Sequence, residues 1–264
     1  MTRTAPAPDP GAWEWLTPRV ARRRLPHWDC TAGLVAGRGA ALLVEAGATL
    51  AEGARLRAEA EALLATVPGA AGPDGPRVTQ LALTHPHFDH VLGAPAFPGA
   101  EVYTAVGADR LLTGATGLAE LAADAVRQGV PEAEATAAAE AAAATGEAGV
   151  HRHAVSGEWT LDLGGGRQVL LANVGPGHTA HDLAVLVPAE DGAPEIVFCG
   201  DLVEESGPPQ AGPDAIPARW PEALDRLLAL GGPDARYVPG HGAVVDAGFV
   251  RRQRDQLALR FGVS

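Results

Sequence analysis

The segment His85-Pro86-His87-Phe88-Asp89-His90 constrains the fold more than any other feature of the chain. It places four metal-binding side chains within six residues, directly after the apolar, strand-like stretch 78–83. Because successive side chains of an extended chain point to opposite faces, His85 and His87 can reach the same point. A turn after Phe88 would bring Asp89 and His90 to the other side of that point. The segment therefore predicts a buried strand ending in one loop that serves two adjacent metal positions.

Three later residues supply the further ligands that two metal positions need. His178, Asp201 and His241 each come after an apolar run, and each is directly preceded by glycine. We expect each to lie where a strand ends in a glycine-flanked turn, because glycine lets the backbone approach an ion closely. Together with segment 85–90 they make five histidines and two aspartates. One shared carboxylate would then complete two sites whose ions lie about 3.5–4 Å apart, as in two-metal hydrolases.

The order of these motifs resembles the metallo-β-lactamase fold superfamily of metal-dependent hydrolases, from about Trp13 to Phe261. The specific part is the H-x-H-x-D-H loop, which G-H-T at 177–179, G-D at 200–201 and P-G-H-G at 239–242 follow in order. No ligand of the two-metal pattern is missing, so the chain is similar to the glyoxalase II and general hydrolase branch. The resemblance implies these ligands: His85, His87 and His178 for a first metal, Asp89, His90 and His241 for a second, and Asp201 bridging both.

The resemblance also implies the fold, an α+β αββα four-layer sandwich in which two sheets lie between helices. Hydrophobic periodicity alone predicts only a mixture of helices and strands. We expect residues 1–11 to be a disordered lead-in and residues 12–264 to form a single metallo-β-lactamase-like domain. The alanine-rich stretch near residues 107–149 predicts two or three helices, broken near 129–131, and we expect it to be a helical insertion over the rim of the site.

Local patterns predict the other elements. Apolar alternation and turn residues indicate strands, and the stripe of Leu56, Leu63 and Leu64 indicates a helix. Three glycines at 164–166 are typical of a hairpin. Strands are expected within 19–44 and at 78–83, 101–106, 157–163, 167–174, 183–187, 195–199 and 237–238, and helices at 52–67, 221–230 and 249–259.

Several residues outside the ligand set are candidates for supporting roles. Relatives usually carry aspartate in an early L-V-D-T-G-like turn that supports the metal site, and this chain has Glu45 there. Glu45 can make the same kind of hydrogen bond with a longer side chain. His181 is either a proton donor to the leaving group or a surface or supporting residue. His27 and Trp28 lie where relatives line the substrate groove. Cys199, two residues before Asp201, is expected to be a small buried residue.

The resemblance implies a hydrolase that holds two divalent metal ions, first of all Zn²⁺, with iron or manganese as alternatives. A hydroxide bridging the metals would cleave a thioester, ester or lactone of a small molecule, and Asp89 and His181 are the candidate catalytic residues. Two other activities stay open, a mononuclear iron oxidoreductase similar to persulfide dioxygenases and a β-lactam hydrolase. A non-catalytic metal-binding protein is disfavoured because all seven ligands are present.

Composition narrows the partners and the compartment. A net charge of −12 disfavours nucleic acid, which needs a basic surface. Every basic residue is arginine, so an anionic substrate group would need arginine, a backbone amide or the metal. Cys30 and Cys199 make no disulfide framework, and neither an apolar signal region nor a membrane-length run is visible. We therefore expect a cytoplasmic protein that acts on a small molecule, away from nucleic acid and membrane, and leave its oligomeric state open.

Overall fold

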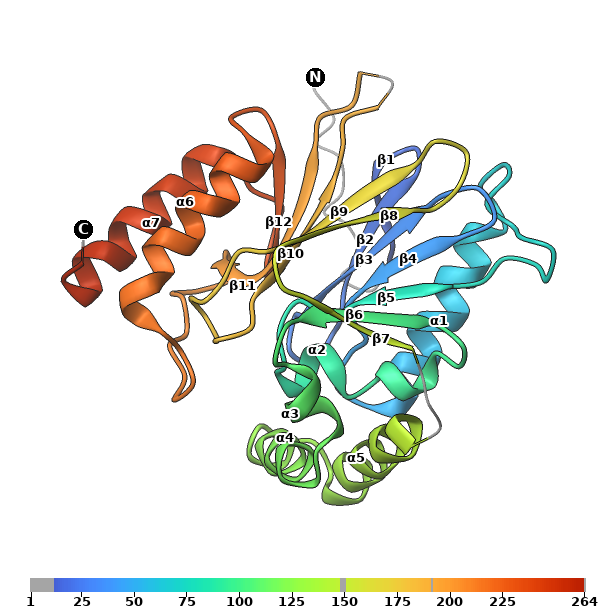
Figure 1. Ribbon diagram of the computed structural model, residues 1–264, viewed down its shortest axis with the longest axis horizontal. Helices are drawn as coiled ribbons and strands as arrows, with labels where there is room; N and C mark the ends of the chain where they lie inside the picture. Colours follow the sequence, from blue (N-terminus) through green and yellow to red (C-terminus); the bar gives the residue numbers. More distant parts are fainter. Residues whose placement is uncertain (1–11, 148–150, 191, 264) are drawn as a thin grey trace, which may run out of the picture.

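The computed structural model describes residues 12–147, 151–190 and 192–263. Two β-sheets face each other, and helices cover both outer faces (Figure 1). This layering confirms the expected αββα sandwich. The expected disordered lead-in, residues 1–11, lies outside the described residues, and the assignment of 12–264 to one domain stays a prediction.

The first sheet has an antiparallel half and a parallel half. Its seven strands lie in chain order, antiparallel from β1 to β4 and parallel from β4 to β7. The crossovers between the parallel strands carry α1 to α5, which pack on one outer face. The strands are β1 (Glu14–Thr17), β2 (Val20–Arg24), β3 (Thr31–Ala36), β4 (Ala41–Val44), β5 (Gln80–Ala82), β6 (Glu101–Ala105) and β7 (Arg152–Val155).

The second sheet has five strands in the order β12-β11-β10-β9-β8. Only the β11–β12 pair is parallel, and its crossover helix α6 packs with α7 on the other outer face. The strands are β8 (Glu158–Asp162), β9 (Gln168–Asn173), β10 (Leu183–Val187), β11 (Ile196–Glu204) and β12 (Arg236–His241). The α-helices are α1 (Leu50–Leu64), α2 (Phe88–Val91), α3 (Asp109–Thr113), α4 (Ala115–Arg127), α5 (Glu132–Glu147), α6 (Trp220–Gly231) and α7 (Ala247–Phe261), with short 3₁₀ turns at Ala94–Ala96 and Pro217–Arg219.

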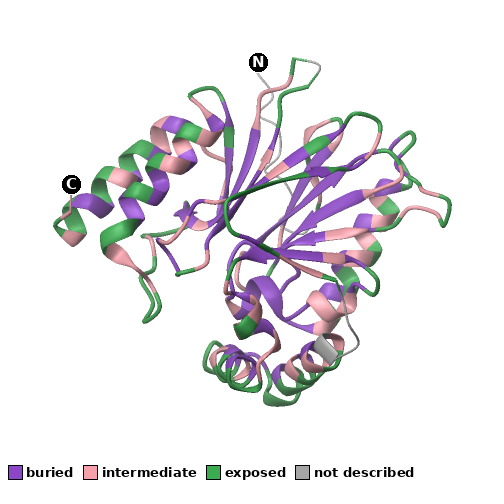
Figure 2. Cartoon of the chain, viewed as in Figure 1, coloured by how far each residue is buried: buried purple, intermediate pink, exposed green. Residues whose placement is uncertain are grey.

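Alternation along the strands sorts apolar side chains into three buried layers. In β4, Leu42 and Val44 lie between the sheets, whereas Ala41 and Leu43 pack against the helices of the first outer face. Figure 2 shows the central strands buried along most of their length, with exposed residues on the outer sides of the helices and in the loops. Because both faces of the central strands are covered, polar side chains have most room near the ends of the sheets.

The predicted helices are confirmed, with ends set by capping residues. The helix predicted at 52–67 begins at Leu50, because the Thr49 hydroxyl caps it by accepting from Glu52 N at 3.1 Å. The Asp246 carboxylate likewise accepts from Phe249 N at 2.7 Å and starts α7. None of the described helices has the length and apolar character needed to cross a bilayer.

The alanine-rich stretch forms three helices, α3 to α5, with the predicted break between Arg127 and Glu132. Leu118 and Leu121 are buried against the first sheet, while Val126 is 39% exposed. Trp28 Nε1 donates to the Gln128 carbonyl at 3.4 Å, so the turn between α4 and α5 touches the β2–β3 loop. The helical segment therefore belongs mainly to an outer layer and meets the loops of the site at this turn.

Two strands escaped prediction, and both lie at the edges of the first sheet. β1 and β7 each have a single neighbouring strand, and most of their residues are partly exposed. His153 belongs to β7, where its ring stacks on Tyr103 at 4.6 Å between centroids. Edge strands need little apolar alternation, which is the signal that sequence reading relies on.

The close approach of the two sheets at Gly33 gives a test of the packing. A Cβ atom at Gly33 would overlap the ring of Phe198, so Gly33→Ala should lower the free energy of unfolding by about 1–3 kcal/mol. Gly157→Ala is the matched control, because no atom lies within 4 Å of its added Cβ. Urea denaturation of both variants measures the difference, and equal stability of the two would contradict the packing at Gly33.

Candidate metal centre

The loop after β5 takes the conformation that its sequence predicts. His87 has extended backbone and precedes the single-turn helix α2, which contains Asp89 and His90. The chain therefore turns after Phe88, as expected, and presents ligands on two sides. His85 and His90 are 2% and 0% exposed, so their ring nitrogens need partners inside the protein.

The loop that carries His178 is organised by Asp182. The Asp182 carboxylate accepts from Thr179 N at 2.9 Å and from the Thr179 hydroxyl at 2.8 Å. Burial raises the pKa of Asp182 to about 7, against the opposing effect of these hydrogen bonds. Ile216 N also donates to the Gly177 carbonyl at 2.9 Å, which joins the His178 loop to the segment before α6.

The expected positions of Asp201 and His241 in turns after strands need correction. β11 continues to Glu204 and β12 continues to His241, so Asp201 lies within a strand and His241 ends one. The pairing of these strands shifts register around Gly200, whose φ is +53°. A Cβ at Gly200 would also meet the side chain of Thr84. This irregularity directs Asp201 toward the first sheet, a usual role of a bulge beside a functional site.

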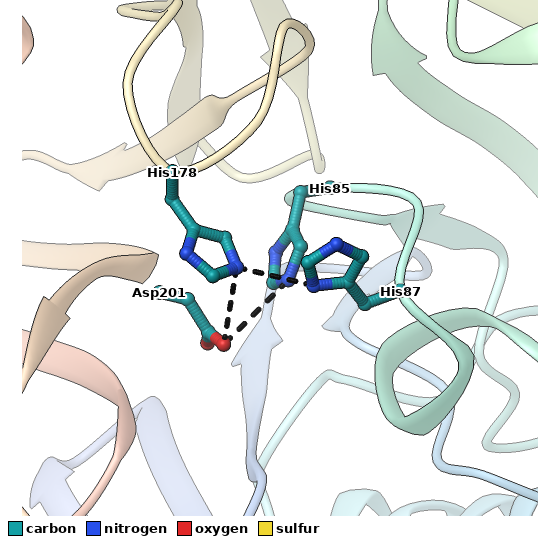
Figure 3. A group of neighbouring side chains, drawn as sticks. All are labelled: His85, His87, His178 and Asp201. Carbon is teal, nitrogen blue, oxygen red and sulfur yellow. Dashed lines mark hydrogen bonds and ion pairs between the residues drawn. The ribbon is translucent and has the colours of Figure 1, made fainter. Parts of the chain in front are cut away.

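Three histidines and Asp201 form the first group of donor atoms (Figure 3). His178 Nε2 lies 3.1 Å from His87 Nδ1 and 3.5 Å from Asp201 Oδ2. His85 Nε2 lies 3.7 Å from the same carboxylate oxygen. His85 and His87 come from the loop after β5, His178 from the loop after β9, and Asp201 from β11. The four side chains therefore reach one point from both sheets.

The second group shares Asp201 with the first. His90 Nε2 lies 3.3 Å from Asp201 Oδ1 and 3.4 Å from Asp89 Oδ2. His241 Nε2 lies 3.3 Å from Asp201 Oδ2 and 3.5 Å from Asp89 Oδ2. All seven side chains predicted from the sequence are therefore close together, with the Asp201 carboxylate between the two groups.

These separations fit metal ions better than direct contacts. A tetrahedral ion with bonds of about 2.0–2.1 Å keeps neighbouring donors about 3.3–3.4 Å apart, whereas hydrogen-bonded atoms lie closer. Buried atoms His85 Nε2, His90 Nε2 and Asp201 Oδ1 make no hydrogen bond. Unsatisfied polar atoms are costly in a protein interior, so their convergence fits a bound cation.

The outer nitrogen of each histidine supports the same interpretation. In all five rings one nitrogen faces the cluster and the other faces an acceptor outside it, which fixes the neutral tautomer that a ligand needs. The outer contacts are His85 Nδ1 with Thr84 Oγ1 at 2.9 Å, His87 Nε2 with Asp214 Oδ2 at 3.0 Å, His90 Nδ1 with Glu45 Oε1 at 3.3 Å, His178 Nδ1 with the Gln210 carbonyl at 3.1 Å, and His241 Nδ1 with the Trp28 carbonyl at 2.7 Å.

Glu45 makes the supporting contacts expected of it. It accepts from the Thr84 hydroxyl at 2.5 Å, and Thr84 in turn accepts from His85. The same oxygen faces His90, so one carboxylate orients a histidine of each group. Glu45 is 1% exposed and has φ of +66°, a strained conformation for a residue with a side chain.

Asp214 and Cys30 were missed by the sequence analysis. Asp214 lies in a Pro- and Gly-rich loop with no motif of its own, 127 residues from His87. Cys30 Sγ lies 3.5 Å from His90 Nδ1, on the side of the ring that faces away from Asp201. Burial raises the pKa of the Cys30 thiol, which disfavours a thiolate ligand. Cys199 is 1% exposed, which confirms the expectation of a small buried residue.

His181 lies apart from the two groups of donor atoms. Its Nδ1 donates to the Val106 carbonyl at 2.9 Å, and none of the groups found among the described residues includes it. A Cβ at Gly107 would contact its ring at 2.7 Å, so the ring packs on the start of the helical segment. The role of His181 as a proton donor therefore stays a prediction.

The two groups differ in their affinity for protons. In the first group, burial lowers the pKa of His85 well below its usual value and lowers that of His178 to about 4. Burial also lowers the pKa of His87, but its hydrogen bond to Asp214 and the nearby carboxylate charges outweigh burial and raise it. Burial acts in the same direction on His90 and His241, but neighbouring negative charges outweigh it. The pKa of His241 rises to about 9, mainly through Asp201, and that of His90 rises well above its usual value.

The sequence matches the profile of the metallo-beta-lactamase superfamily over residues 25–241. The chain therefore belongs to this superfamily, whose members are mostly metal-dependent hydrolases. A search of the curated proteins finds no significant match.

Solved structures of metallo-β-lactamases share the fold. TMB-1 aligns with a TM-score of 0.64 at 16% identity, covering 96% of this chain and all (100%) of that one. FIM-1 from Pseudomonas aeruginosa, in a mono-zinc form, aligns at 0.64 with 19% identity and 96% coverage of each chain. The enzyme from Pontibacter korlensis aligns at 0.62 with 20% identity, covering 93% of this chain and 98% of its own. At these identities the likeness establishes the fold.

The difference in proton affinity predicts the order of metal binding. Lowered pKa values disfavour a proton on His85 and His178, whereas raised pKa values favour one on His87 in the first group and on both His90 and His241 in the second. The second equivalent of Zn²⁺ should therefore release more protons than the first, and its affinity should rise more steeply with pH up to about pH 9. Calorimetry in buffers of different ionisation enthalpy measures proton release, and equal release for both equivalents would contradict the assignment.

The Asp214 contact predicts a selective loss of metal. Asp214→Ala should weaken binding of the first zinc ion by about 10–100-fold, because His87 loses the acceptor that orients it. Asp214→Asn keeps a hydrogen-bond acceptor for His87, so it should weaken zinc binding less than Asp214→Ala does. Asp225→Ala is the matched control, since this aspartate is equally exposed and pairs with Arg254 instead. Chelator competition gives the affinities, and an Asp214→Ala protein indistinguishable from the control would refute the role.

Proposed function

We propose that this protein is a binuclear metal-dependent hydrolase that cleaves a small thioester, ester or lactone. The observation that carries the proposal is the position of Asp201. Its Oδ2 lies 3.3–3.7 Å from Nε2 of His85, His178 and His241, and its Oδ1 lies 3.3 Å from Nε2 of His90. A single carboxylate is thus placed to be shared by two ions.

The residues divide between two ions. His85, His87 and His178 would hold one, and Asp89, His90 and His241 the other, with Asp201 common to both. When bound, two divalent ions supply a Lewis acid for the substrate carbonyl and lower the pKa of water to near neutrality. The outer contacts of the histidines hold the rings in place, so the protein needs little rearrangement when substrate binds.

Asp89 has a second task in the proposed mechanism. It is the second residue of α2 and places Oδ2 within 3.5 Å of Nε2 of both His90 and His241. A carboxylate in this position can accept a hydrogen bond from the attacking water and orient its lone pair toward the carbonyl carbon. Burial raises the pKa of Asp89, but His90 and His241 outweigh burial and keep it ionised and able to accept.

The first alternative activity, iron-dependent persulfide oxidation, uses one metal, and the complete second group of donors argues for two. The second, β-lactam hydrolysis, is the activity that the names of the structural relatives carry. Those relatives are at most 20% identical to this chain.

Metal content and turnover test the proposal together. The purified protein should bind two equivalents of zinc and hydrolyse a thioester, ester or lactone. Asp89→Asn should lower kcat/KM by at least about 10²-fold while leaving the fold intact, because the amide lacks the negative charge that would bind the metal and orient the attacking water. Asp225→Asn, far from the donor groups in a surface ion pair, should retain full activity.

Two outcomes would contradict the proposal. Zinc binding with no cleavage across a panel of thioesters, lactones, phosphoesters and β-lactams would remove the substrate assignment. Iron binding with oxygen consumption on a persulfide would favour the oxidoreductase instead.

A further inference from the structure

Two carboxylates lie beside ligand histidines of the candidate metal centre. Asp214 bonds to His87 and leaves 49% of its side chain exposed. Glu205 follows β11, and its own N–H donates to the His241 carbonyl at 3.1 Å. Its Oε2 accepts from Ala243 N at 2.7 Å, which fixes this carboxylate beside the strand end that carries His241. Two negative groups are thus held next to histidines of both donor groups.

The arginines nearest to these carboxylates already have partners. Arg22 bonds to the Gly242 carbonyl at 3.0 Å and pairs with Glu14 at 2.8 Å. Arg24 forms a two-point contact with Asp29. The hydrogen bond with Asp29, and then the charges of Asp29 and Glu205, raise the pKa of Arg24 against burial. Arg24 is therefore close to Glu205, but its guanidinium is paired with Asp29.

The charges at the centre do not favour an anion even with metal bound. Two divalent ions would bring four positive charges, and five carboxylates surround them before the nucleophile is counted. These are Asp89, Asp201, Glu45, Asp214 and Glu205. Two buried atoms, His85 Nε2 and His90 Nε2, make no hydrogen bond with the described residues, which points to a bound cation here. The nearby carboxylates would then influence which substrate binds to that cation.

We propose that the substrate is uncharged beside the bond that is cleaved, a thioester, ester or lactone without a carboxylate in the part that docks against Asp214 and Glu205. The inference rests on the proposed function and narrows its substrate class. A carboxylate in that position would lie near two like charges, and this repulsion would weaken as salt screens it. An amide or alkyl group of the same size meets no such repulsion.

A matched pair of thiols tests this selection without requiring turnover. The probes are 3-mercaptobenzamide and 3-mercaptobenzoate, which share the metal-binding thiol and differ in charge at one position. Calorimetry should show that the zinc-loaded protein binds the amide about ten-fold more tightly than the benzoate. Added salt should reduce this ratio of the two dissociation constants. Glu205→Gln should also narrow it, because glutamine still accepts from Ala243 N without the charge. Glu158→Gln, on the remote edge strand β8, should leave the ratio unchanged.

Turnover of the corresponding S-aryl thioacetates separates this inference from the proposed function. Faster hydrolysis of the carbamoyl-substituted thioacetate than of the carboxylate-substituted one supports both the inference and the proposed function. Equal affinity for the two thiols, or tighter binding of the benzoate, overturns the inference even if the protein hydrolyses thioesters. Tighter binding of the amide by a protein that cleaves no thioester, ester or lactone supports the charge selection and contradicts the hydrolase assignment.

Discussion

The carboxylate of Asp201 joins the two sheets of this protein electrostatically. It projects from β11 of the second sheet toward His85 and His90, which follow β5 of the first. A carboxylate buried at such a junction is costly unless positive charge accompanies it. The surrounding histidines supply that charge and hold the pKa of Asp201 well below its usual range. The same interaction raises the pKa of His241 to about 9 and that of His90 well above its usual value.

Backbone strain gathers around the same junction. The non-glycine residues with positive φ among those described are Asp29 and Glu45, and both lie beside the centre. Glu45 orients His90, and Asp29 follows Trp28, whose carbonyl accepts from His241. Such conformations cost of order 1–3 kcal/mol each and persist where surrounding contacts hold them. The covered sheets supply that support, because both of their faces are buried in apolar layers.

The sequence is most informative where chemistry is local. The spacing within 85–90 fixes which side chains can meet, and the resemblance extends the ligand set to His178, Asp201 and His241, which the structure brings together. The four-layer fold came from the resemblance, because periodicity reports only which segments are helix or strand. Edge strands β1 and β7 carried no clear alternation. Asp214 was unpredictable for a different reason: it reaches His87 only through the course of an irregular loop, which depends on tertiary contacts.

The loop between β11 and α6 contacts the candidate metal ligands and also carries the residues of the proposed substrate selection. Its Gln210 carbonyl orients His178 and its Asp214 carboxylate orients His87, so it completes the first group of donors. Arg260 of α7 donates to the Pro209 carbonyl at 2.7 Å and ties this loop to the outer helix layer. The same loop carries the charges proposed to repel anions. A change in this segment that altered the preferred substrate would therefore also disturb His87 or His178, unless it preserved the two acceptors. Substitutions at Glu205 should change the substrate preference with the least effect on the metal ligands. Its carboxylate accepts from Ala243 N and not from a ligand side chain among the described residues.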